Sequence, residues 1–339
     1  MNFDSVVVLS FGGPEGPEDV MPFLRNVTRK RNVPDGRLAE VAEQYRAFGG
    51  ISPINQQCRD LVAALEQELR QHNIDLPVYW GNRNWDPFLA DTVKRMVSDG
   101  RQHALVFVTS AFSSYSGCRQ YREDMSRSTE ATPGLSLHKL RLFYNHPGFI
   151  QTFATNVKSA IESMKPTENQ RVVFTAHSIP LSMAATSEYE LQLHEAARLV
   201  AAELNLKSDQ WALAFQSRSG PPSMPWLEPD INDLLKEAAS QGVTGVVVAP
   251  LGFTSDHMEV MFDLDIQAKE TADSLGLQFS RASTVGTSPK FVSMIRQLIE
   301  ERTSEAPRLA LGSLGAWPDE CPEGHCALTE RPRRPDLKP

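Results

Sequence analysis

The sequence predicts an α/β protein made of two doubly wound parallel-sheet domains with a cleft between them. Apolar, β-branched runs alternate with helical patterns along most of the chain, as in α/β proteins. Several runs are apolar on consecutive positions, which is typical of strands that are covered on both faces. The chain has 339 residues, 41% of them hydrophobic, and this length allows two domains of ordinary size.

The first half of the chain holds four predicted strands with helical patterns between them. The strand-like runs are 5–11 (SVVVLSF), 76–81 (LPVYWG), 104–110 (ALVFVTS) and 135–143 (LSLHKLRLF). Pro53 stands at a position where proline begins a helix well. The predicted helices of this half are 35–47, 54–71 and 86–98.

The second half repeats the alternation. Its predicted strands are 171–176 (RVVFTA), 211–217 (WALAFQS) and 245–250 (GVVVAP). Pro229 is again well placed to begin a helix. The predicted helices of this half are 147–163, 189–205, 228–241, 256–274 and 288–302.

A hinge between the two halves is predicted at 143–150 (FYNHPGFI). The first domain is therefore expected at 1–145, joined by the helix near 288–303, and the second at 146–287. After residue 304 the composition changes to Pro, Gly and charged residues. Residues 304–339 are predicted to form a cysteine-bearing tail that packs only where something anchors it.

Composition excludes several classes of protein. The formal net charge of −8 argues against a broad nucleic-acid-binding face. No segment approaches the roughly 18 consecutive apolar residues of a membrane span, and the first residues lack the pattern of a signal peptide. We therefore expect a cytoplasmic protein whose four cysteines are reduced thiols or metal ligands.

Unusual sequences follow several of the predicted strands. Ligands of doubly wound sheets bind beyond the carboxyl ends of the strands, so these sequences predict one cleft lined by loops. They are SFGGPEGP, TSAFSSYSGCRQY, AHSIP, QSRSGPPSMPW and LGFTSDHMEVMFD.

His177, at the end of a predicted strand, is the first candidate for chemistry. If 256–265 (DHMEVMFDLD) is helical, then Asp256, Glu259 and Asp263 share one face. Carboxylates and an imidazole suit a divalent first-row metal ion such as Fe²⁺. Asp256 alone would be explained as a helix N-cap. His257 should point away from this face, and we assign it no role.

The remaining loops offer binding residues. FGGPEG (11–16) fits neither a dinucleotide nor a phosphate-binding loop, so no nucleotide cofactor is expected. GGISP (49–53) and QSRSGPPSMPWLEPD (216–230), with Trp226, suit rigid pocket walls or simple helix entries. A basic cluster has two alternative explanations, a solvated face or recognition of substrate carboxylates; its members are Arg25, Arg29, Lys30 and Arg31.

Three cysteines have the pattern of a partial metal site. Cys321 and Cys326 flank PEGH in the tail, and Cys118 follows a predicted strand. Such spacing is compatible with half of a metal site or with free thiols.

Several of these segments together resemble the signature sequences of ferrochelatases over residues 4–303. The segments are SFGGP, YRAFGGISPIN, TAHSIP, FQSRSGPPSMPWLEPD and PLGFTSDHMEVMFDLD. SYSGCRQYRED and the cysteine-bearing tail are most similar to actinobacterial members. The resemblance implies two Rossmann-like domains around a porphyrin cleft, and insertion of Fe²⁺ into coproporphyrin III in haem biosynthesis.

The resemblance also implies roles for individual residues. His177 and Glu259 match the pair at the metal-insertion site, and Asp263 matches the next acid on the same helix. The porphyrin-contact candidates are Ser52, Tyr121, Arg29, Phe11 and Trp226. The expected partners are the porphyrin, Fe²⁺ and, transiently, neighbouring haem-pathway enzymes.

Three departures from the family pattern matter. Phe11 stands where related Gram-positive enzymes carry a tyrosine that can ligate the porphyrin iron. Gln267 stands where a further acid often extends the carboxylate ladder. Relatives with a [2Fe–2S] cluster offer four cysteines, whereas Cys118, Cys321 and Cys326 are the three expected here.

The resemblance implies a [2Fe–2S] cluster on those three cysteines. Such a cluster usually takes four ligands, so His325 or Asp319 is the candidate for the fourth. Cys58 is expected to lie elsewhere.

Four other functions remain open from the sequence. Protoporphyrin IX could be the porphyrin substrate, or cobalt or nickel the inserted metal. A haem or metal carrier without turnover would share the bilobed body. A zinc hydrolase using His177, Glu259 and Asp263 lacks a third-ligand motif such as HExxH and ranks last.

Overall fold

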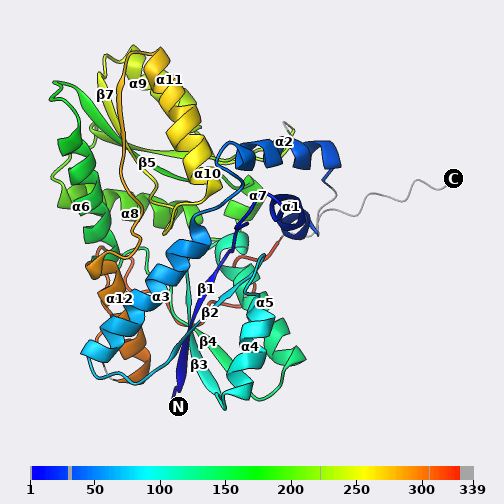
Figure 1. The fold of residues 1–339 in the computed structure, drawn as a ribbon. Helices are drawn as coiled ribbons and strands as arrows, with labels where there is room; N and C mark the ends of the chain where they lie inside the picture. The colour runs from blue at the N-terminus through cyan, green and yellow to red at the C-terminus, as the bar shows by residue number, and fades with distance from the viewer. Residues whose placement is uncertain (1, 30–32, 222, 305, 329–339) are drawn as a thin grey trace.

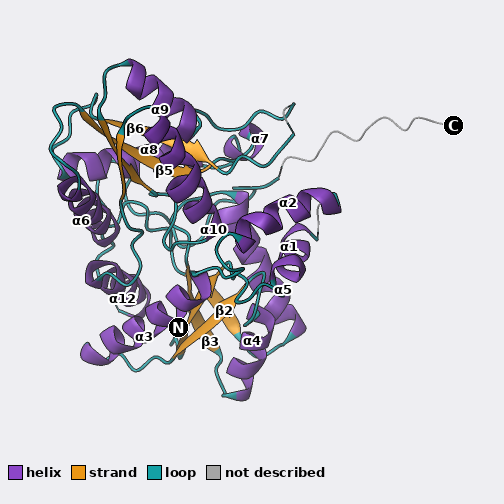
Figure 2. Ribbon diagram, turned by 45° about the horizontal axis from the view of Figure 1, so that its top comes forward, coloured by secondary structure: helices purple, strands orange, loops and turns teal. Residues whose placement is uncertain are grey.

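The structure is a computed structural model that describes residues 2–29, 33–221, 223–304 and 306–328. Within these residues the strands form two four-stranded sheets, and every strand pairing is parallel. Figure 1 shows the two sheets one above the other, and Figure 2 shows helices around both. The predicted α/β fold class with two parallel sheets is confirmed.

The two sheets have the same strand order. The first, β2-β1-β3-β4, contains β1 (Ser5–Ser10), β2 (Val78–Asn82), β3 (His103–Val108) and β4 (Ser136–Lys139). The second, β6-β5-β7-β8, contains β5 (Gln170–His177), β6 (Trp211–Gln216), β7 (Gly245–Ala249) and β8 (Gln278–Arg281). In each sheet the order reverses beside the first strand, which creates a switch point between β1 and β3 and another between β5 and β7.

Helices connect the strands throughout the described residues. Those of the first half are α1 (Val20–Thr28), α2 (Asp35–Arg46), α3 (Ile54–Gln71), α4 (Leu89–Ser98), the π-helix η1 (Tyr115–Arg119) and α5 (Gln120–Ala131). Those that follow are α6 (Pro147–Ser163), α7 (Leu181–Ala184), α8 (Tyr189–Glu203), α9 (Ile231–Ser240), α10 (Met258–Val260), the π-helix η2 (Met261–Ala268), α11 (Lys269–Ser274) and α12 (Pro289–Thr303).

One hydrophobic core runs through both sheets. It contains Val6 and Phe107 of the first sheet together with Phe174 and Val247 of the second. Each sheet has a separate core on its other face. Every residue of β1 and of β7 is buried, which explains their unbroken apolar sequences.

The last helix ties the two halves together. α12 packs against both α3 and α6. The Oε1 atom of Glu68 in α3 accepts hydrogen bonds from Ser293 Oγ at 2.8 Å and Arg296 Nε at 2.9 Å. These contacts are compatible with the prediction that the helix near 288–303 joins the first domain. The boundaries of the two domains stay a prediction.

Some elements differ from the prediction. The strand expected at 135–143 ends at Lys139, after which residues 140–143 turn into the core. Helix α1 was missed because Pro22 interrupts its sequence, although proline is tolerated in a first helical turn. The edge strand β8, with the short sequence QFSR, was also missed because it has little apolar pattern.

The tail is anchored over the residues that the structure describes. Arg141 Nη2 donates to the carbonyl of Leu309 at 2.8 Å, and Asn145 Nδ2 donates to that of Gly315 at 2.8 Å. Farther along, Cys326 N–H donates to the carbonyl of Thr186 at 2.7 Å. The buried polar residues Arg141 and Asn145 therefore supply an anchor for the tail. Among the described residues, no helix has the length and apolarity to cross a membrane.

Candidate active site

The carboxyl ends of the two sheets face each other at the centre of the molecule (Figure 1). Thr254, which follows β7, donates a hydrogen bond from Oγ1 to the carbonyl of Thr109, which follows β3, at 3.0 Å. Both residues lie just beyond a switch point. His177 is the last residue of β5, so it lies at the switch point of the second sheet. Sheet topology therefore brings His177 to the place where such folds bind ligands.

The surroundings of His177 fix the orientation of its ring. Nδ1 lies 2.5 Å from the carbonyl oxygen of Ser178. A carbonyl only accepts hydrogen bonds, so Nδ1 carries a proton and Nε2 is the nitrogen that can accept one. The Tyr189 hydroxyl donates to the main-chain carbonyl of His177 at 2.9 Å, which holds the strand end in place.

Glu259 lies opposite this free nitrogen. His177 Nε2 is 3.6 Å from Glu259 Oε2, and the two side chains are 32% and 53% exposed, so both face open space. Burial alone would lower the pKa of His177, but the Glu259 carboxylate raises it above its ordinary value. Burial would raise the pKa of Glu259, yet His177 holds it well below its usual range. The pair is an ionised carboxylate beside an imidazole that readily accepts a proton.

Asp263 extends the acidic stripe along the π-helix η2. Its carboxylate accepts a hydrogen bond from Ser217, which has a φ of +63° that a non-glycine residue rarely adopts. Burial raises the pKa of Asp263 to about 6, a shift that the Ser217 hydroxyl opposes and the Glu259 charge reinforces. Asp263 can thus gain or lose a proton close to neutral pH.

Asp256, Glu259 and Asp263 were expected to share one face of a helix, and this prediction is wrong for Asp256. This residue precedes α10, whose N-cap is His257, and its carboxylate pairs with Arg281 at 3.0 Å. Residues 261–268 form a π-helix, which changes the side-chain spacing that an α-helix would give. Only Glu259 and Asp263 therefore remain together near His177.

His257 was wrongly expected to point elsewhere. It has extended backbone angles because it caps the helix, and its Nδ1 accepts a hydrogen bond from the Glu259 N–H at 3.2 Å. The same nitrogen is 4.0 Å from Glu259 Oε2, and the ring packs edge-on against Phe253. An imidazole two residues before a helical carboxylate is the sequence signal that could have revealed this neighbour.

Two further neighbours were not predicted. Gln216, paired with His177 across the β5–β6 ladder, donates from Nε2 to the carbonyl of Glu259 at 3.2 Å. Tyr45 is buried beside the site, and burial together with the Glu259 charge raises the pKa of its hydroxyl. Tyr45 belongs to a small core that joins α1 and α2 to Met258 of α10.

The porphyrin-contact candidates differ in accessibility. Phe11 is 36% exposed, whereas Ser52 and Tyr121 are each 4% exposed and Trp226 is 8% exposed. The ring of Tyr121 lies under the Arg83 guanidinium, 4.5 Å from its centroid. Their contact with a porphyrin stays a prediction.

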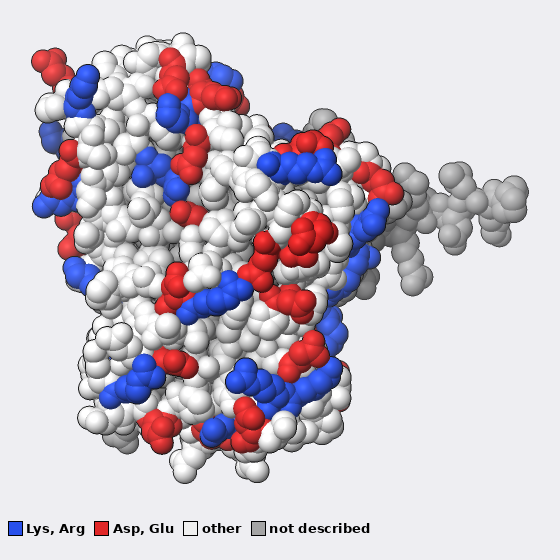
Figure 3. Space-filling view, in the orientation of Figure 1, with Lys and Arg blue, Asp and Glu red and all other residues white. Residues whose placement is uncertain are grey.

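The basic cluster is described only in part. Arg25 and Arg29 are exposed on or directly after α1, and Arg29 Nη1 donates to Asn26 Oδ1 at 2.6 Å. Lys30 and Arg31 lie outside the described residues. Figure 3 shows basic and acidic side chains interspersed over one face of the molecule.

Glycines allow two of the loops to pack tightly together. A Cβ atom on Gly13 would lie 2.7 Å from both Ser52 and Ile54. Gly50 has a φ of +76°, and a Cβ there would lie 2.5 Å from the Pro17 Cα. The loops at 11–16 and 49–53 therefore brace each other beside Phe11.

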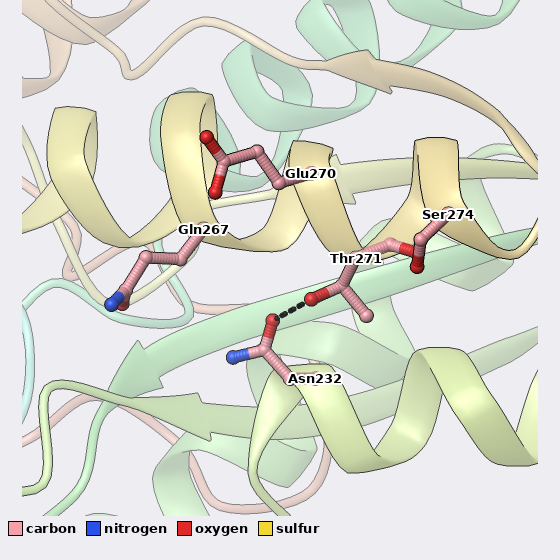
Figure 4. Close-up of a pocket in the computed structure, with 5 residues that line it drawn as sticks. All are labelled: Asn232, Gln267, Glu270, Thr271 and Ser274. Atoms are coloured by element: carbon pink, nitrogen blue, oxygen red, sulfur yellow. Dashed lines mark hydrogen bonds between the residues drawn. The ribbon is translucent and has the colours of Figure 1, made fainter.

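A polar groove lies between α9 and the helical segment made of η2 and α11. Its volume is about 420 Å³, and Figure 4 shows the Thr271 hydroxyl bonded to Asn232 across it. It is lined by Asn232, Gln267, Glu270, Thr271 and Ser274. None of the predicted catalytic residues lines this groove.

The three predicted cluster cysteines lie in one region. The thiols of Cys118 and Cys321 lie close together, and Cys118 holds the pKa of the Cys321 thiol below its ordinary value. Cys326 is buried with a φ of +58°. Cys58 lies apart, in α3 beside Ser10. Nevertheless, no three His, Cys, Asp or Glu side chains in the described ranges form a group that could hold a metal ion.

Comparison with known proteins identifies the family. The ferrochelatase family model matches residues 4–303. A ferrochelatase of Rhodopirellula baltica is 50% identical over 99% of this chain and 96% of its own length. A coproporphyrin III ferrochelatase of Frankia alni is 50% identical over 97% of this chain and 87% of its own, and one of Streptomyces coelicolor is 46% identical over 97% and 95%.

Solved structures agree on the fold. SirB from Bacillus subtilis superposes with a TM-score of 0.54 at 11% identity, covering 89% of this chain and 98% of SirB. CbiX, the terminal enzyme of sirohaem synthesis in denitrifying bacteria, gives 0.50 at 15% identity over 88% and 98%. These likenesses concern the fold alone. Because the family model and the relatives span nearly the whole chain, this protein belongs to the ferrochelatase family.

Proposed function

We propose that the protein inserts Fe²⁺ into coproporphyrin III. The observation that carries this proposal is the His177–Glu259 pair, 3.6 Å apart at the switch point of the second sheet. The names of the relatives from Frankia and Streptomyces support coproporphyrin III as the substrate. The exposed Arg25 of α1 and Arg29 directly after it would suit a porphyrin with more propionates than protoporphyrin IX.

Insertion requires two pyrrole protons to leave the macrocycle while the iron enters. A rigid cleft that bends the ring exposes its nitrogens and favours a shape close to the transition state. His177 Nε2 accepts the first proton, since the neighbouring carboxylate raises its pKa. Glu259, whose pKa is lowered, stays anionic and holds the iron. Asp263, with a pKa of about 6, takes this proton from His177 and passes it outward, so that Nε2 can accept the second pyrrole proton in turn.

The test is anaerobic Fe²⁺ insertion with coproporphyrin III and protoporphyrin IX in parallel, for the wild type and His177→Ala. We expect turnover that favours coproporphyrin III and is lost in the variant, while porphyrin binding is retained. Preference for protoporphyrin IX would overturn the substrate, and faster insertion of Co²⁺ or Ni²⁺ would overturn the metal. Binding without turnover would favour a carrier.

A [2Fe–2S] cluster on Cys118, Cys321 and Cys326 is a second, finer proposal. Its support is the contact between the first two thiols and the buried, unpartnered Nε2 of His325, which would supply a fourth ligand. Against it stands the lack of a metal-binding group among the described residues. The insertion mechanism does not depend on the cluster.

Protein made anaerobically with ample iron tests the cluster. Visible absorbance and acid-labile sulfide that disappear in Cys321→Ser but persist in Cys58→Ser would support it. Absence of both signals from the wild type would end this proposal. A cytoplasmic location and transient contacts with neighbouring haem-pathway enzymes also stay proposals, based on the sequence.

A further inference from the structure

Arg281 bridges two carboxylates that flank the proposed insertion site. It is the last residue of β8, and its side chain is 17% exposed. Nη1 and Nη2 donate to the two oxygens of Asp256 at 3.0 and 3.4 Å. Nε donates to Asp265 Oδ1 at 2.5 Å. The planar guanidinium thus holds both aspartates at once, which a lysine ammonium cannot do with the same geometry.

The two aspartates enclose the segment that carries the acidic side chains. Asp256 lies three residues before Glu259, and Asp265 lies two residues after Asp263. Between them the chain passes from an extended cap through α10 into η2. A π-helix is rare and occurs mostly as a short insertion in an α-helix, so contacts from outside the helix help to set its shape. Arg281 supplies such support at both ends of the segment.

The Asp256 end is also fixed to the first half of the chain. The Asp256 N–H donates to Gln57 Oε1 of α3 at 2.9 Å. Two residues earlier, Thr254 bonds to the carbonyl of Thr109, which follows β3. The segment is therefore held between an anchor in the first half of the molecule and Arg281 in the second, and these contacts fix its position relative to His177.

We propose that Arg281 is a positioning residue for Glu259 and Asp263. Its contacts with Asp256 and Asp265 hold the segment so that the Glu259 carboxylate faces His177 Nε2 at the observed 3.6 Å. Arg281 itself contacts neither His177 nor Glu259 in any hydrogen bond or ion pair of the described residues. The inference rests on the proposed function, because it concerns the same pair of side chains.

Steady-state insertion kinetics form the first arm of the test. Arg281→Gln should lower kcat/KM for Fe²⁺ by about 100-fold, since a misplacement near 1 Å has an effect of this size. Arg281→Lys keeps the charge but not the planar guanidinium with its several donors, so its kcat/KM should lie between those of Arg281→Gln and the wild type. Porphyrin affinity, measured by fluorescence, should stay unchanged. The control is Arg171→Gln, the same change at the opposite end of the sheet, where Arg171 bonds to Gln241.

Co²⁺ alone is the probe in the second arm, which does not need turnover. Its visible absorption bands should appear on binding at His177 and Glu259, and Arg281→Gln should weaken this binding while Arg171→Gln does not. Asp256→Asn, which keeps the shape of the aspartate, should act in the same direction. It replaces Arg281→Gln if thermal melting shows that the latter unfolds.

The outcomes separate the two proposals. A wild type that binds Co²⁺ but inserts Fe²⁺ into no porphyrin would contradict the proposed function, and the Co²⁺ titration would still test Arg281. A wild type that turns over, with Arg281→Gln and Asp256→Asn equal to Arg171→Gln in both arms, would overturn the positioning role. A loss that follows reduced porphyrin affinity alone would overturn it as well.

Discussion

The imidazole Nε2 of His177 lies 3.6 Å from the Glu259 carboxylate. Glu259 raises the pKa of His177 and His177 lowers the pKa of Glu259, so each group favours the charged form of the other. They come from different elements, the end of β5 and the short helix α10. Nδ1 of the same ring contacts the Ser178 carbonyl. Nε2, which faces Glu259, is therefore the nitrogen that can accept a proton from the substrate.

Glu259→Gln should lower kcat for Fe²⁺ insertion by about 10²–10³-fold, the range for loss of one group that stabilises charge at the reacting centre. The amide keeps the shape of the carboxylate but cannot hold Fe²⁺ as an anion. Porphyrin affinity should be retained. Anaerobic absorbance assays measure this loss. The matched control is Glu270→Gln, in the polar groove between α9 and α11. Equal losses in the two variants would contradict the role of Glu259.

The Asp263 carboxylate should impose a pH dependence on insertion. Its raised pKa of about 6 means that the group is protonated below this pH and ionised above it. If the ionised form carries protons outward, then kcat falls as the pH falls through about 6. In Asp263→Asn, the ionisation near pH 6 should disappear from the pH profile of kcat. Only the fall caused by protonation of His177 should remain. A variant profile that has the wild-type shape at lower amplitude would argue against the relay.

Glu301→Gln should destabilise the fold by about 3–5 kcal/mol, because it leaves Arg141 as a buried, uncompensated charge. The side chains of Arg141 and Glu301 are each 1% exposed, and the pair also holds the tail through the Leu309 carbonyl. Urea unfolding measures the loss. Glu162→Gln, at an exposed pair with Lys158, should cost less than about 0.5 kcal/mol. Similar midpoints for the two variants would refute the argument.

Gly13→Ala should separate the loops beside Phe11. The new methyl group would lie 2.7 Å from Ser52 and Ile54, and overpacking of this kind costs about 1–3 kcal/mol. We expect weaker porphyrin binding by fluorescence titration, with a lower Tm. Gly36→Ala is the control, because a Cβ there has no neighbour within 4 Å and alanine favours the helix. Unchanged porphyrin affinity in Gly13→Ala would show that the loop contact does not shape the cleft.

Much of the fold could be predicted because local sequence reports burial directly. The runs SVVVLSF and GVVVAP each contain consecutive apolar residues, and the strands that they form are buried on both faces. His177, Glu259 and Asp263 could likewise be chosen from their residue types and their places after strands. The ferrochelatase signatures pointed to the family that the comparisons then identified.

Contacts between distant segments could not be read from local pattern. Asp256 belongs to the same short motif as Glu259, yet its partner is Arg281, on a strand whose sequence gives little signal. His257 turns toward Glu259 because it caps the helix in extended conformation, and a π-helix follows where an α-helix was expected.

The sequence by itself determined the parallel strands, the strand-end histidine and the acidic residues of the site, since these depend on burial and residue chemistry along the chain. Only the tertiary structure decided the shared strand order, the anchored tail and the arrangement of carboxylates around His177. The physical reason is that these features arise from packing and charge pairing between segments that lie far apart in the chain.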